Sequence, residues 1–234
     1  MTNTINIFKK EFRGYFISPI AYIVISIFLV LTGWFFFSTF FLFGQAEMRN
    51  FFSLLPVILS FIIPAVTMRL FSEEFNTGSY ELLLTMPVSP LNIILGKFLA
   101  ATAFVAIMLM PTLAYAFFIS FLGDLDWGPV IGGYTGAVLL GAAFSSIGLF
   151  ASSLTRNQII AFITGMTLCF VLTLIDKMLF FLPESLLSVF QFLGADFHFQ
   201  NISKGVVDSR DLLYFLSVCF VMVYGTNLVI QEKK

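Results

Sequence analysis

Long stretches without a single Asp, Glu, Lys or Arg dominate this chain. Six of these charge-free windows reach the length of a membrane span, with 33, 19, 26, 29, 19 and 20 residues. A helix that crosses a bilayer needs about 20 apolar residues, because it rises ~1.5 Å per residue through a hydrocarbon core ~30 Å thick. Each window therefore predicts one helix. We predict six transmembrane helices, near residues 17–42, 51–70, 92–121, 130–153, 158–180 and 212–230.

The apolar runs are continuous and do not alternate with polar residues, which favours helices over the strands of a membrane β-barrel. Hydrophobic residues make up 59% of the chain and charged residues 11%, against about 45–50% and about 25% in soluble domains. A soluble enzyme could not bury that much apolar surface. The predicted fold class is an all-α integral membrane protein with one transmembrane domain over residues 1–234.

The basic residues give the expected orientation. With six spans both termini share one side, and eight of the 12 Lys and Arg residues lie on that side. By the positive-inside rule, the termini are predicted to be cytoplasmic. Before the first span, Ile5, Phe8, Phe12 and Phe16 recur at helical spacing, which predicts a short amphipathic helix in the cytoplasmic interface. A plain positive flank to an uncleaved first span is the alternative.

The longest predicted cytoplasmic connection joins the second and third spans over residues 69–97. Phe71 and Phe75 are four residues apart, which continues a helix beyond the membrane surface. Gly78 then supplies a permissive backbone for a turn. Charge is rare in this chain but concentrated here, where Glu73, Glu74 and Glu81 accompany Arg69 and Lys97.

A short helix is expected within this connection. Ser79 is predicted to cap a helix over residues 80–85, and Pro87 to end it. Ser89 is predicted to cap the helix of the third span in the same way, with proline in its first turn. Such a short helix suits docking to a soluble partner, although a solvated loop between two spans fits the composition as well.

The outer segment 176–211 is too apolar for a free loop, yet its charge-free pieces are too short to span. It predicts interfacial or re-entrant helices near residues 184–193 and 196–204. Asp176 and Lys177 are expected to pair with each other. His198 is the single histidine of the chain, and a structural role is expected for it.

Small residues recur every four positions along the fourth predicted span. This spacing lets helices approach closely in lipid. Packing within the subunit is the default interpretation, and a contact between two subunits is the alternative. The glycines concerned are Gly132, Gly136, Gly141 and Gly148.

Motifs of catalysis and energy conversion are missing from the sequence. It contains no GxxxxGK[ST] phosphate loop, no GxSxG, no HExxH and no cluster of His and Cys. The predicted spans lack the carboxylates of an ion relay. A net charge of −1 lacks the excess of positive charge that binding to nucleic acid requires. We therefore expect a non-enzymatic chain without a metal or cofactor of its own, driven by a partner on the inner face.

Residues 69–97 resemble the signature region of type-2 ABC export permeases. In that family an acidic pair precedes Gly-[Ser/Thr]-x-Glu-x-Leu-Leu, then Leu/Met-Pro-Val-Ser, then Gly-Lys at the third span. This chain reads Glu73-Glu74, Gly78-Ser79-Tyr80-Glu81-Leu82-Leu83, Met86-Pro87-Val88-Ser89 and Gly96-Lys97.

A second stretch, from His198 through Phe199 to Gly205 and on to Phe215, also resembles that family. It is most similar to the branch of gliding-motility permeases and the nitrous-oxide-reductase maturation permease. The resemblance covers nearly the whole chain. Three predicted features agree with it: the six-span layout, the interfacial helix and a hairpin of outer helices before the last span. The residues of both motifs favour the gliding-motility branch.

The resemblance implies a half-transporter in a bacterial inner membrane. Two permeases, identical or sisters, would pair in the lipid bilayer, and each would dock on a separate cytoplasmic ATPase that binds ATP and magnesium. The implied coupling residues are Glu73, Glu74, Gly78, Ser79, Tyr80, Glu81 and Pro87. Two other functions stay open, namely a self-sufficient channel or secondary carrier, and a membrane scaffold without a transport cycle.

Overall fold

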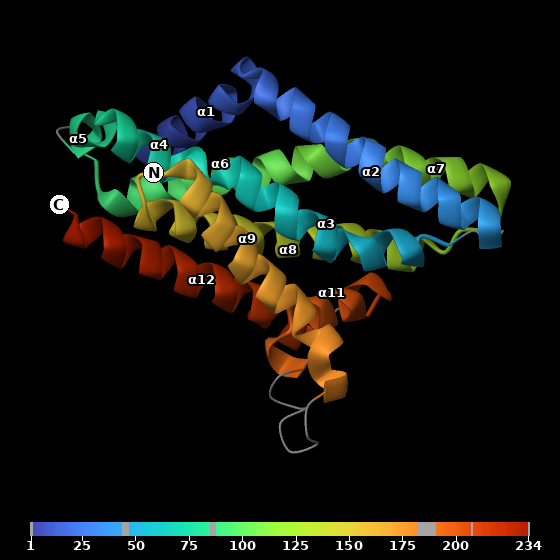
Figure 1. The fold of residues 1–234 in the computed structure, drawn as a ribbon. Coiled ribbons are helices and arrows are strands. Elements are labelled where there is room, and N and C mark those ends of the chain that lie inside the picture. Colours follow the sequence, from blue (N-terminus) through green and yellow to red (C-terminus); the bar gives the residue numbers. More distant parts are fainter. Residues whose placement is uncertain (1, 44–46, 85–87, 182–190, 207, 234) are drawn as a thin grey trace.

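The computed structural model describes residues 2–43, 47–84, 88–181, 191–206 and 208–233, and every regular element within these ranges is a helix. The bundle is elongated, and both termini lie at the end that also carries α4 and α5, here called the termini end (Figure 1). The elements are α1 (Thr2–Ile17), α2 (Pro19–Phe43), α3 (Arg49–Thr67), α4 (Arg69–Thr77), α5 (Ser79–Leu84), α6 (Pro90–Leu109), η1 (Met110–Thr112), α7 (Leu113–Leu122), α8 (Trp127–Leu154), α9 (Gln158–Leu174), η2 (Asp176–Phe181), α11 (Ala195–Ser203) and α12 (Ser209–Glu232).

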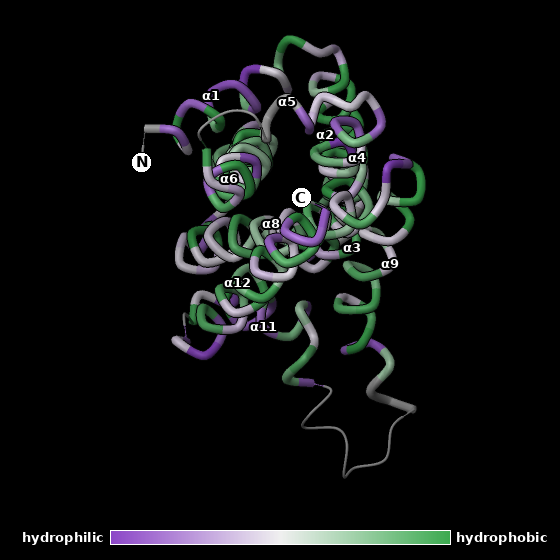
Figure 2. The backbone as a smooth tube through the Cα atoms, turned by 90° about the vertical axis from the view of Figure 1, so that its left-hand side faces the viewer, coloured by the Kyte–Doolittle hydropathy of each residue, from purple (hydrophilic) through white to green (hydrophobic). Residues whose placement is uncertain are grey.

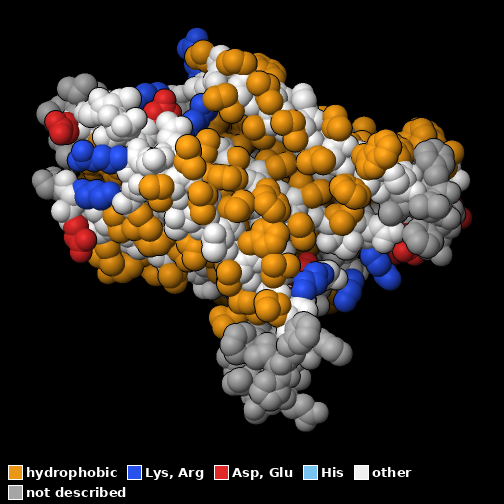
Figure 3. Space-filling model, in the orientation of Figure 1, with side chains coloured by type: hydrophobic (Ala, Val, Ile, Leu, Met, Phe, Trp, Pro, Cys, Tyr) orange, Lys and Arg blue, Asp and Glu red, His pale blue; other side chains and the backbone are white. Residues whose placement is uncertain are grey.

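Within the described residues, five helical stretches are long and apolar enough to cross a membrane. They are Pro19–Ser38, Arg49–Thr77, Pro90–Leu122, Trp127–Leu154 and Ser209–Glu232. Apolar side chains cover the middle of the molecule, whereas charged ones gather toward its ends (Figure 3). The all-helical membrane fold is thereby confirmed. The sixth predicted span corresponds to α9, which is apolar but has only 17 residues, so the count of six stays a prediction.

Prolines and turns divide two of the predicted spans. The second corresponds to α3, and the helix continues as α4 after a break at Met68, whose N–H donates to the Pro64 carbonyl over 2.9 Å. The third is interrupted by the 3₁₀ turn η1, which contains Pro111. Proline cannot donate the i→i−4 hydrogen bond and disturbs the helix around it.

The predicted amphipathic helix is α1. The helix is interrupted by a bend at Ser18 before α2 begins. Phe8, Phe12 and Phe16 form a row of rings with successive centroids 5.5 and 5.2 Å apart, packed against the core. Figure 2 shows more hydrophilic residues along α1 than along the spans. Of the two predicted outer helices, the second is α11, and the first lies mostly outside the described residues.

Helix α8 forms the centre of the bundle, and its glycines receive neighbouring helices of the same chain. A Cβ on Gly136 would come within 3.2 Å of Phe199, and one on Gly141 within 2.6 Å of Val105. At Gly148 it would collide with Thr67 of α3. The glycine stripe therefore packs against helices of the same subunit, and a contact between two subunits stays a prediction.

Gly132→Ala is expected to destabilise the chain. A Cβ there would collide with the carbonyl oxygen of Ile202 and lie 3.2 Å from the Gly205 Cα. These are backbone atoms, so α11 must move, at a cost of about 1–3 kcal/mol. Thermal unfolding in mild detergent measures the effect. Gly14→Ala, with nothing within 4 Å of the added atom, is the control, and equal midpoints for both variants would contradict this packing.

Candidate functional site

The signature segment at the termini end folds as a helix, a turn and a short helix. Gly78 has φ 72° and ends α4 in the left-handed region, where glycine carries no Cβ penalty. Helix α5 begins at Ser79 itself, so Ser79 is its first residue and not its cap, and the Gly78 carbonyl accepts from the Glu81 N–H over 3.2 Å. Ser89 does cap α6, accepting from the Asn92 N–H. Pro87 lies outside the described residues.

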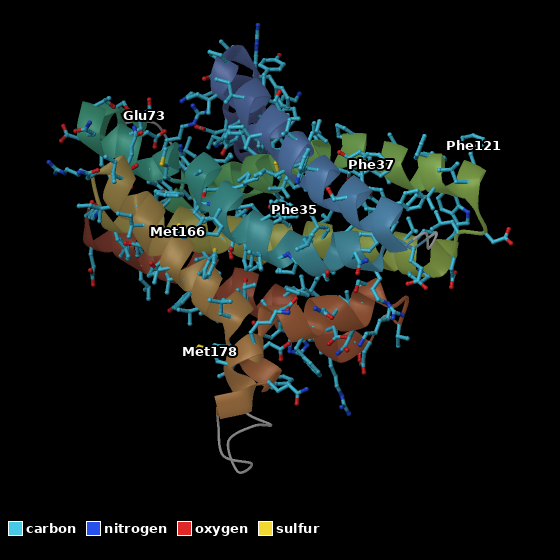
Figure 4. The ribbon with its side chains drawn as sticks, turned by 45° about the vertical axis from the view of Figure 1, so that its right-hand side comes forward. Phe35, Phe37, Glu73, Phe121, Met166 and Met178 are labelled. Atoms are coloured by element: carbon cyan, nitrogen blue, oxygen red, sulfur yellow. The ribbon has the colours of Figure 1, made fainter. Side chains whose placement is uncertain are left out.

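Aromatic rings hold α5 against α4. Phe71 stacks on Phe75 at 5.9 Å, and Tyr80 meets Phe75 edge to face at 4.9 Å. Tyr80 is buried, whereas Glu73 and Glu81 are exposed. Glu73 is seen at the end of the molecule in Figure 4. Of the sequence-predicted residues, Glu73 and Glu81 are thus available to a partner, and Tyr80 shapes the segment that carries them.

Lys97 of α6 joins three helices at one buried point. Its side chain is 1% exposed, and its Nζ donates to Glu74 of α4 over 2.7 Å, to Glu11 of α1 over 3.1 Å and to the Leu70 carbonyl over 2.8 Å. All three ammonium protons are therefore used. Glu74, which the resemblance placed among the coupling residues, is 14% exposed and pairs with Lys97 of the same chain. Sequence reasoning missed Glu11, because α1 and α6 are 86 residues apart at this contact.

Helix α4 is also held from its other sides. The Phe71 N–H donates to Ser152 Oγ of α8 over 3.1 Å. Lys233, just past α12, donates to the Ser153 carbonyl over 2.6 Å, and its Nζ lies 4.4 Å from the Phe75 ring centroid. Burial, with the Arg156 charge nearby, lowers the pKa of Lys233. The Arg69 guanidinium of α4 also lies 5.1 Å from the ring centroid of Tyr15 in α1. Contacts from α1, α6, α8 and Lys233 thus converge on this nine-residue helix.

At the opposite end, His198 fastens α11 to α12. Its Nδ1 lies 2.6 Å from Asp211 Oδ1, its Nε2 lies 2.9 Å from the Phe192 carbonyl, and its ring stacks on Tyr214 at 4.1 Å. Both ring nitrogens are occupied, and no group of three metal ligands occurs in the described ranges. The structural role expected for His198 fits this geometry, although sequence reasoning did not foresee its carboxylate partner.

The remaining outer residues pack or pair nearby. Phe199 is buried against α8, and Gly205 has φ 86° and approaches the backbone of Gly128. Lys177 binds Asp196 over 2.7 Å, so the expected pairing of Lys177 with its neighbour in sequence is wrong. Asp196 is almost fully buried, and a buried carboxylate needs a cation more than a half-exposed one does.

Lys97→Met is expected to lower the free energy of unfolding by about 3–5 kcal/mol, because it leaves two largely buried carboxylates without a cation. Adding Glu74→Leu to Lys97→Met should restore part of the loss. Thermal unfolding and limited proteolysis of the detergent-purified chain measure both effects. Lys9→Met, which removes an exposed charge from α1, is the control. A midpoint for Lys97→Met as high as that of the control would show that the ion triad does not hold these helices.

The family model described as ABC-2 family transporter protein matches residues 5–233, which include every candidate membrane span and both clusters described above. No curated protein matches the chain. The match covers nearly the whole sequence, and members of this family are transmembrane components that work with an ABC ATPase. The chain therefore belongs to the ABC-2 transporter family and is a multi-pass membrane subunit of an ABC transporter.

Proposed function

We propose that this chain is the permease subunit of an ABC exporter, in which residues 69–97 couple a separate cytoplasmic ATPase to the membrane helices. One observation carries the proposal. Helix α4 contacts α1, α6, α8 and Lys233 just past α12. Glu73 on α4 and Glu81 on α5 stay exposed. A force applied to the exposed side of this segment would therefore reach several spans at once.

The topology supports six spans with the termini end in the cytoplasm. Both termini lie at the same end of the bundle (Figure 1), which requires an even number of crossings. Five helices qualify by length, and α9, with 17 residues, lies between the last two of them. A span of about 17 residues is at the short end of the known range. The excess of Lys and Arg beside the termini end favours a cytoplasmic location for it.

Coupling of this kind is a free-energy linkage. ATP binding on the partner must favour one arrangement of the permease over another, since a ligand shifts an equilibrium only by its differential affinity for the two states. In the proposed complex ATP and magnesium bind the ATPase, and this chain supplies no catalytic group. Two permease copies, identical or sisters, pair in a bacterial inner membrane.

The task of the proposed complex is inferred from the branch of the family that the two motifs resemble most. We infer a gliding-motility type complex, which moves a lipid-like substrate or transmits force to components outside the membrane. Apolar side chains exposed along the spans, among them Trp34, Phe121 and Phe220, fit a lipid environment for either task.

Glu81→Lys is expected to reduce the amount of ATPase that co-purifies with the chain by about tenfold or more, because like charges set against each other at an interface cost several kcal/mol. Purification from the native membrane with quantitative mass spectrometry measures the loss. Glu232→Lys, the same reversal at the exposed end of α12, is the control. If the wild-type chain purifies without an ATPase under conditions that keep other ABC complexes intact, the proposed function is wrong.

A further inference from the structure

A cavity of about 410 Å³ lies at the end of the bundle opposite the termini end, where α3 and α8 begin and α11 ends (Figure 1). Its size is within the roughly 300–1,000 Å³ typical of ligand pockets. The buried side chains of Phe52 and Val130 form part of its apolar lining. Trp127, which follows Asp126 of the same lining, is 42% exposed. Because tryptophan at the end of a span marks the membrane–water interface, the cavity lies at the level of the lipid headgroups.

Four charged side chains line this cavity without pairing with one another. Two are positive and two are negative, and all of them are exposed: Arg49, Lys204, Glu47 and Asp126. No ion pair joins any two of them in the part of the chain that the structure describes. Figure 3 shows basic and acidic side chains beside α11, where the apolar surface ends. A purely anionic or purely cationic ligand would be repelled by half of this lining, whereas a ligand that carries both charges can meet all of it.

The beginning of α3 favours the negative group of such a ligand. Its N-cap residue, Met48, makes no side-chain cap hydrogen bond, and Met48 and Arg49 both line the cavity. The first backbone N–H groups of this 19-residue helix are therefore available as donors. The helix dipole adds partial positive charge at the same place. A phosphate group suits such a helix end beside an arginine.

Asp126 gives the place of the positive group. Its Oδ1 atom caps α8 by accepting from the Gly128 N–H over 3.1 Å. Its Oδ2 atom accepts no hydrogen bond within the described ranges. Glu47 adds a second exposed carboxylate to the lining. A primary ammonium group has three donors and one positive charge, so it can bind both carboxylates.

An apolar stripe leads from the cavity along α3. Ser53 lines the cavity, and Val57 and Phe61 follow it at four-residue steps on the same face of the helix. Val57 is half-buried, and Phe61 is 43% exposed. The stripe offers a contact surface for an acyl chain that runs from the cavity toward the middle of the bundle. A soluble zwitterion would make no use of it.

We propose that this cavity binds the headgroup of a zwitterionic aminophospholipid of the phosphatidylethanolamine class. The phosphate meets Arg49 at the start of α3, the ammonium group meets Asp126, and one acyl chain follows Val57 and Phe61. The inference requires a membrane location for the chain and does not depend on the coupling role of α4 and α5. In the proposed orientation the lipid belongs to the outer leaflet.

The test titrates lipids into the delipidated, detergent-purified chain and measures dissociation constants by native mass spectrometry. The wild-type chain should bind phosphatidylethanolamine about tenfold more tightly than phosphatidylglycerol, which has the phosphate but no ammonium group, because a hydrogen bond between charged groups contributes about that much. Asp126→Asn keeps a capping side chain for α8 and should abolish the preference. Arg49→Gln should weaken the binding of both lipids about tenfold. Asp124→Asn and Arg210→Gln, which change exposed residues outside the lining, are the matched controls.

Glycerophosphoethanolamine, the same headgroup without acyl chains, separates a lipid site from a site for a soluble zwitterion. It should bind at least tenfold more weakly than the lipid, and equal binding overturns the lipid assignment. Equal affinity of the wild-type chain for the two lipids overturns the proposed site, as does an Asp126→Asn chain that keeps the preference. Thermal unfolding should give the wild-type midpoint for every variant, since the substituted side chains are exposed. Lys204→Gln, with the same expected effect, replaces Arg49→Gln if that variant unfolds.

Discussion

The buried ammonium group of Lys97 is the interaction on which the termini end of this protein depends. Removing a charge from water is costly, and the cost is met only where the charge is fully hydrogen-bonded and faces an opposite charge. Lys97 meets this condition by drawing Glu11, Glu74 and the Leu70 carbonyl to one point. Helices α1, α4 and α6 can separate only by exposing one of these partners, so they are held as one unit.

A different constraint acts in the apolar interior, where neither charge nor water is available to hold helices together. There the glycines of α8 replace specific polar contacts with close approach, which gains dispersion energy over a long surface. Phe52, Val105 and Thr67 fill the space above Gly133, Gly141 and Gly148. The bundle is therefore held by close packing around α8 at its centre and by the ion cluster of Lys97, Glu11 and Glu74 at one end. Helix α4 contacts both.

The sequence allowed the all-helical membrane fold, α1 and the close packing of α8 to be predicted, because each depends on a pattern within one segment. The length of a charge-free window identifies a membrane span. Small residues every four positions identify the face of a helix that packs closely on its neighbours. The pairings of Lys97 with Glu11 and of His198 with Asp211 could not be predicted, since each joins elements whose contact exists only after folding. The position of Ser79 inside α5 differed for a local reason, because Gly78 in the left-handed region already turns the chain and no separate cap residue follows it.

These contacts also connect the two ends of the molecule. Helix α12 is tied near its start to the outer residues, through Asp211 and His198 and through the Tyr214 hydroxyl and the Leu193 carbonyl. Just past its other end, Lys233 rests on Phe75 of α4. A continuous helix of 24 residues transmits displacement along its axis, since its backbone hydrogen bonds resist both stretching and compression. In the proposed transporter, a movement imposed on α4 at the ATPase would therefore reach α11 along α12, and it would also reach α8, against which α12 packs along its length.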